Sequence, residues 1–122
     1  MEATVGSVAA LFALMGGLAL AWPGRIVALF GIGELTADGR NEVRAVYGGL
    51  GLAAALALVW GLVNPRLAPG IFYTMGLLLW GMAAGRVISL LIERRAGFFP
   101  YLFLGVELVG GGALLWASIR AG

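Results

Sequence analysis

One stretch of the sequence, Leu67–Ile92, reads LAPGIFYTMGLLLWGMAAGRVISLLI and contains a single charged residue, Arg86. About 20 apolar residues in a helix cross the hydrocarbon core of a bilayer, which is roughly 30 Å thick, at about 1.5 Å per residue. Inside hydrocarbon the backbone must satisfy its own hydrogen bonds, so a run of this kind is expected to be helical. The stretch therefore predicts a membrane span over residues 67–92.

Three further apolar runs predict three more spans. They cover residues 3–24, 43–64 and 98–118. The first run contains Ala19-Leu20-Ala21, a small-x-small pattern seen at signal-peptide cleavage sites, but no basic residue precedes it, so we expect a span there too. The sequence therefore predicts an all-α integral membrane protein, with residues 1–122 forming one antiparallel bundle of four transmembrane helices.

The connections between these runs differ in length. Short links at Asn64-Pro65-Arg66 and at Glu93–Gly97 predict tight turns between antiparallel helices. The longer link between the first two spans contains Arg25–Phe30, which we expect to form a short interfacial helix. Thr36, just before the second span, offers a helix N-cap.

Composition narrows the class of function. The 122 residues are 61% hydrophobic and only 11% charged, against about 25% charged in a typical soluble domain. No Cys and no His is present, which removes disulfides, thiolate chemistry and His-based metal or triad sites. The basic residues are scattered arginines rather than a clustered face, so nucleic-acid binding is not expected. We expect no enzymatic activity, no metal and no cofactor, because no nucleophile–base pair or ligand cluster is visible.

Charge also predicts the orientation in the membrane. The side that holds the first and third connections is richer in arginine than the side that holds the termini. By the positive-inside rule the arginine-rich side faces the cytoplasm. For a protein of the bacterial inner membrane, this places both termini in the periplasm.

Three charged residues lie within or at the edge of the predicted spans: Arg44, Arg86 and Glu107. From the helical rise, Arg86 lies about 10 Å and Glu107 about 14 Å from the same membrane surface. We therefore expect a polar cluster of Arg44, Tyr47, Arg86 and Glu107, with Glu107 ionised. In the structural interpretation, Glu107 forms a buried salt bridge with Arg86 or Arg44. Otherwise Arg44 extends to the head groups, and Arg86 extends toward the membrane surface with Glu93 as its partner. In the functional interpretation, two arginines against one carboxylate leave a positive surplus that suits a phosphate, a carboxylate or a lipid head group.

Small residues occur in every span and suit close helix packing. The candidate packing positions are Gly48, Gly51, Gly81, Gly85, Gly110 and Gly111. Packing within one bundle and contact between copies of the chain are both compatible with this pattern.

The run Gly39-Arg40-Asn41-Glu42-Val43-Arg44-Ala45-Val46-Tyr47-Gly48-Gly49 resembles a signature in a bacterial family of small four-span membrane proteins known only as a domain of unknown function. The resemblance covers nearly the whole chain. It implies a fold and no activity, and Arg44, Tyr47, Gly48, Arg86 and Glu107 match its positions. A more distant resemblance links the chain to the DoxX proteins.

Three functions remain open from the sequence. The arginine-rich cluster favours binding of an anionic amphiphile or lipid head group, with membrane lipids as partners. The small size and many glycines also suit an accessory subunit of a larger membrane complex. The third alternative is a homo-oligomeric transporter of ions or small molecules.

Overall fold

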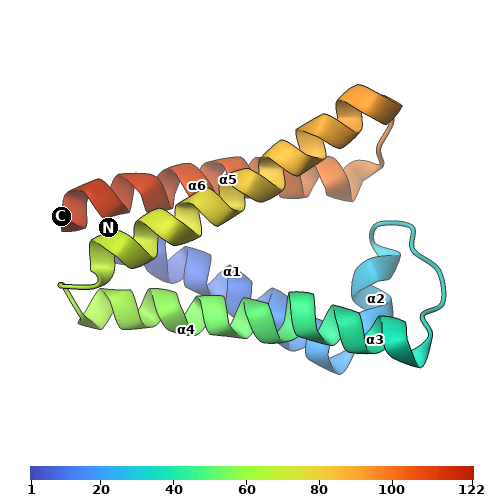
Figure 1. Cartoon of the computed structure of the whole chain (residues 1–122), viewed down its shortest axis with the longest axis horizontal. Helices are drawn as coiled ribbons and strands as arrows, with labels where there is room; N and C mark the ends of the chain where they lie inside the picture. Colours follow the sequence, from blue (N-terminus) through green and yellow to red (C-terminus); the bar gives the residue numbers. More distant parts are fainter.

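The computed structural model describes residues 1–122, and its helices form two antiparallel pairs (Figure 1). In one pair α1 packs against α4, and in the other α5 packs against α6. The elements in chain order are α1 (Glu2–Ala21), α2 (Pro23–Ala28), α3 (Ala37–Val43), η1 (Arg44–Gly49), α4 (Leu50–Val63), α5 (Ala68–Glu93) and α6 (Phe98–Ala121).

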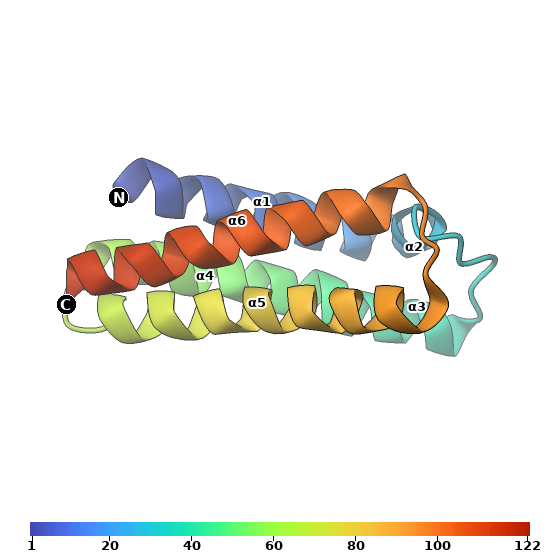
Figure 2. The same cartoon turned by 90° about the horizontal axis from the view of Figure 1, so that it is seen from above.

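Four helices are long and apolar enough to cross a membrane. They are α1, the continuous helix Ala37–Val63 that α3, η1 and α4 make together, α5 and α6. Both views place the two chain termini at the same end of the molecule (Figure 2). The all-α membrane fold predicted from the sequence is confirmed.

The helix boundaries depart from the predicted spans for identifiable reasons. The first helix ends at Ala21, earlier than predicted, because Trp22 leaves the helical conformation (φ −135°, ψ 66°) and Pro23 has no N–H to continue the ladder. The second helix begins at Ala37, ahead of the predicted span, and its N-cap is the predicted Thr36, whose hydroxyl accepts a 3.1 Å hydrogen bond from the Gly39 amide.

The short helix in the first connection is shifted toward the N-terminus. It covers Pro23–Ala28 rather than Arg25–Phe30, with proline at the first helical position, where a missing N–H costs nothing. Leu29 to Gly31 form a turn, and Gly31 adopts φ +77°, a conformation that favours glycine. Phe30 therefore lies in the turn that follows α2, not within a helix.

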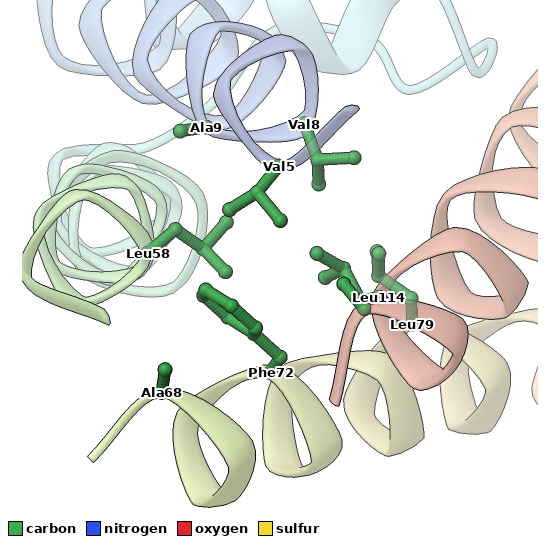
Figure 3. Packing of buried hydrophobic residues seen from close by; sticks show 9 residues of the cluster. Val5, Val8, Ala9, Leu58, Ala68, Phe72, Leu79 and Leu114 are labelled. Atoms are coloured by element: carbon green, nitrogen blue, oxygen red, sulfur yellow. The ribbon is translucent and has the colours of Figure 1, made fainter. Parts of the chain in front are cut away.

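The two pairs meet at the end of the molecule that holds the termini. There Phe72 of α5 is fully buried between Leu58 of α4, Val5 of α1 and Leu114 of α6 (Figure 3). A second, smaller apolar cluster at the opposite end joins α1, α2 and α3 through Ala19, Ile26, Val27 and Val43. The α5–α6 pair diverges from the α1–α4 pair toward this second end (Figure 1).

Glycines allow the helices of each pair to approach closely. A Cβ atom added to Gly16 of α1 would lie 2.8 Å from the backbone nitrogen of Leu52, and one added to Gly51 would lie 3.1 Å from the Cα of Gly16. In the other pair, a Cβ on Gly76 would lie 3.0 Å from the carbonyl oxygen of Gly111. No side chain fits at these positions without moving backbone.

The predicted packing glycines fall into two groups. An added Cβ would meet an atom of another helix within 4 Å at Gly48, Gly51, Gly110 and Gly111. At Gly81 and Gly85 it would meet open space. The latter two therefore do not pack against another helix of this chain.

This difference supplies a matched pair of substitutions. A methyl group at Gly111 would overlap the ring of Trp80, which is held by a 3.1 Å hydrogen bond from its indole nitrogen to the Leu108 carbonyl. We expect Gly111→Ala to destabilise the protein by about 1–3 kcal/mol, the usual cost of overpacking. Gly81→Ala, the control on the same helix pair, should leave stability unchanged or raise it slightly. Thermal melting in detergent measures both, and equal melting temperatures would contradict the close α5–α6 approach.

Candidate functional site

The candidate site is built around an ion pair between α5 and α6. Nε of Arg86 lies 2.9 Å from both carboxylate oxygens of Glu107 and donates to each. This is the one salt bridge of the chain. Glu107 is only 2% exposed, whereas the Arg86 side chain keeps 23% of its surface exposed. The pair therefore has a buried acidic end and an accessible basic end.

Two aromatic rings lie against the Arg86 guanidinium. Its central carbon is 5.5 Å from the ring centroid of Phe30 and 5.7 Å from that of Phe103. The two rings are themselves 5.4 Å apart, tilted by 42°. Aromatic faces attract a guanidinium, and more strongly where water is excluded. Together with Glu107, the rings hold the head of Arg86 in place.

The bonding of Arg86 leaves part of its donor capacity unused. A guanidinium carries five N–H donors, of which the Nε–H accounts for one. The two terminal nitrogens form no hydrogen bond within the chain. Arg86 therefore retains the paired donors that bind a carboxylate or a phosphate in a two-point arrangement.

Arg86 lines a groove of about 570 Å³ at the end of the bundle remote from the termini. One face of α5 supplies most of its wall, with residues at helical spacing: Met82, Gly85, Arg86, Ser89, Leu90 and Glu93. The α5–α6 connection and the start of α6 contribute Arg95, Ala96, Gly97 and Pro100, and Phe30 completes the lining. The groove thus combines apolar walls with charged groups of both signs.

Arg44 occupies a different place from the one predicted. Its Nε donates a 3.0 Å hydrogen bond to the carbonyl oxygen of Leu20, in the last turn of α1. Carbonyls at a helix C-terminus lack backbone partners and carry the negative end of the helix dipole, so a cation is stabilising there. Arg44 therefore caps α1 and makes no salt bridge with Glu107.

Tyr47 lies on the same segment as Arg44, in the π-helical turn η1. It is 41% exposed and forms no hydrogen bond with Arg86 or Glu107. The neighbouring Gly48 is buried, and a Cβ there would lie 2.8 Å from the Leu20 side chain. The segment that carries the signature thus packs on the end of α1. Of the four residues predicted to cluster, the structure joins Arg86 to Glu107 and leaves Arg44 and Tyr47 apart from them.

Sequence reasoning missed Phe30 and Arg95 as parts of the groove. Phe30 was expected in an interfacial helix. Nothing in its spacing relates it to Arg86 and Phe103, which lie 56 and 73 positions further along the chain. Arg86, Ser89 and Glu93 share one face of α5 by their helical spacing, and all three residues line the groove. No group of three or more carboxylates or other ligand side chains is arranged to hold a metal ion.

Comparison with protein families places the chain in a known group. The family described as "Domain of unknown function (DUF4345)" matches residues 1–118. The chain belongs to the DUF4345 family. The resemblance inferred from the segment around Arg44 and Tyr47 is thereby confirmed, whereas the more distant link to DoxX proteins is not shown. No curated protein and no solved structure matches the chain.

The ion pair can be tested by a double-mutant cycle. Glu107→Gln keeps the shape but leaves the Arg86 charge without its carboxylate, and Arg86→Leu leaves Glu107 buried and unpaired. Removing one partner of a buried ion pair lowers the free energy of unfolding by on the order of 3–5 kcal/mol. We expect each single change to lower the melting temperature in detergent clearly, and the double change to recover part of the loss. Three variants that melt like wild type would show that the pair does not form.

Proposed function

We propose that this DUF4345 protein binds an amphiphile, a membrane lipid in the first instance, with the anionic group of the ligand held by Arg86. The observation that carries the proposal is the unused pair of terminal nitrogens on an arginine that Glu107, Phe30 and Phe103 hold in place. A guanidinium ordered in advance loses little entropy on binding a two-oxygen group.

The surroundings of Arg86 support an amphiphilic ligand. Met82, Leu90 and Phe30 give the groove apolar walls, and Ser89 adds a hydroxyl group. A ligand with a polar head and an apolar tail would satisfy both kinds of surface. A small inorganic anion would leave the apolar wall uncovered.

The direct test replaces the guanidinium and keeps the charge. Arg86→Lys retains a cation for Glu107 but loses the two-point donor arrangement. We expect the affinity for dioleoyl phosphatidylglycerol, titrated in detergent and followed by native mass spectrometry, to fall by about tenfold or more, since hydrogen bonds to a charged group are worth about 1.5–3 kcal/mol. Arg66→Lys, in the short link between α4 and α5, is the matched control and should bind like wild type. Equal lipid retention by the two variants would overturn the proposal.

We further propose that the protein lies in a bacterial inner membrane with its termini in the periplasm. Arg25, Arg40, Arg44, Arg94 and Arg95 belong to the segments at one end of the bundle, and Arg66 and Arg120 to those at the other. Arginine-rich connections stay in the cytoplasm. The groove would then open near the cytoplasmic leaflet.

The chain has no native cysteine, which makes this orientation simple to test. We expect Ala121→Cys to react with a membrane-impermeant maleimide applied from the periplasmic side of intact cells. Ala96→Cys, in the α5–α6 connection, should react only after the membrane is permeabilised. The reverse pattern would invert the orientation, and labelling of both sites from one side would contradict the four-span arrangement.

A further inference from the structure

The mouth of the groove carries charges of both signs that are not used inside the protein. Glu93 is the last residue of α5, and Arg95 follows it in the connection to α6. Both side chains line the groove and both are exposed. Neither takes part in a salt bridge, because the one salt bridge of the chain joins Arg86 to Glu107. A ligand in the groove would therefore meet an available carboxylate as well as available guanidinium groups.

The sum of these charges argues against a ligand with a large net charge. Glu107 neutralises Arg86, and Glu93 offsets Arg95, so the four groups together carry no net charge. The positive surplus expected from the sequence depended on Arg44, which instead caps α1. A purely anionic head group would be attracted by Arg86 and Arg95 but repelled by Glu93, which would be left without a partner.

The arrangement of the charges along α5 has a direction. Glu93 follows Arg86 by seven residues, which is about two helical turns and roughly 10 Å along the axis. Ser89 lies between them on the same face. The positive group is therefore deeper in the bundle, and the negative group lies at the membrane–water boundary.

We infer that the groove binds the head group of a zwitterionic phospholipid, with its phosphate at Arg86 and its ammonium group at Glu93. This inference rests on the proposed function and adds the second charge of the ligand. A phosphoethanolamine head group has an inner phosphate and an outer primary ammonium, the order that the groove complements. Met82, about one helical turn deeper than Arg86 on the same wall, offers apolar surface on the side to which the acyl chains of such a lipid would extend.

The test compares two lipids that differ only in the outer group of the head. Dioleoyl phosphatidylethanolamine and dioleoyl phosphatidylglycerol share the acyl chains and the phosphate, but only the first carries an ammonium group. Each is titrated against the detergent-solubilised full chain and bound lipid is counted by native mass spectrometry. The variants are Glu93→Gln and, as a matched control, Glu42→Gln in α3, which loses the same charge at the same end of the bundle but outside the groove.

Wild type and Glu42→Gln should prefer phosphatidylethanolamine. Glu93→Gln should weaken phosphatidylethanolamine binding about fivefold, the scale of a partly exposed ion pair. It should leave phosphatidylglycerol binding unchanged or stronger, because a repelling carboxylate is gone. Equal effects of Glu93→Gln on both lipids, or none, would overturn the zwitterion inference. If Arg86→Lys still weakened binding of both lipids, the proposed function would stand without the zwitterion inference. If Arg86→Lys changed the binding of neither lipid, the proposed function would fail as well.

Discussion

A carboxylate buried inside a membrane bundle requires a cation from a neighbouring helix, and the bond between Glu107 and Arg86 meets that requirement. An isolated charge at this depth costs roughly 2.5–3.5 kcal/mol on insertion scales. Glu107 is short and almost fully enclosed, so it cannot extend to the membrane surface as a long side chain can. Arg86 must come to it, and this fixes how α5 and α6 align along their length. Gly76 and Gly111 bring the same two helices close enough for the pairing.

The same bond determines what Arg86 can still do. Because Glu107 accepts from Nε, the two terminal nitrogens of Arg86 form no hydrogen bond within the chain, and Phe30 and Phe103 lie beside its guanidinium and beside each other. Arg86 also lines the groove, which is where a ligand would meet it. Under the proposed function, stability and ligand binding both depend on the same side chains, Arg86 and Glu107, rather than on two separate sites. A buried ion pair is often no more stabilising than apolar residues of the same volume, and the proposed function gives this pair a second role, which is to position Arg86.

The sequence predicted those features that depend on position along a helix. Run length gave the four spans, and the helical rise placed Arg86 and Glu107 at compatible depths. Neither the length of a run nor the helical rise tells how a helix is rotated about its own axis or which helix lies beside it. Arg44 was predicted in the same half of the membrane as Arg86 and Glu107, but η1 packs on α1, so the Arg44 side chain meets the Leu20 carbonyl instead. Gly81 and Gly85 fit a packing motif by spacing, yet no helix of the chain faces them. Phe30 lay in a connection, where periodicity carries no information on contacts.

Arg44 is nevertheless connected to the site through the packing of the first connection. By capping the carbonyl of Leu20, Arg44 secures the end of α1, directly before the turn at Trp22 and Pro23. The short helix α2 that follows is held by Ile26 and Val27, which pack with Ala19 of α1 and Val43 of α3. Phe30 is the second residue after α2, and its ring lies against Arg86. The segment around Arg44 is thus linked to the ion pair by a series of contacts. Arg44 secures the end of α1, and the connection that begins there places Phe30 against Arg86. A residue can in this way contribute to a binding site without touching either the ligand or the charges that receive it.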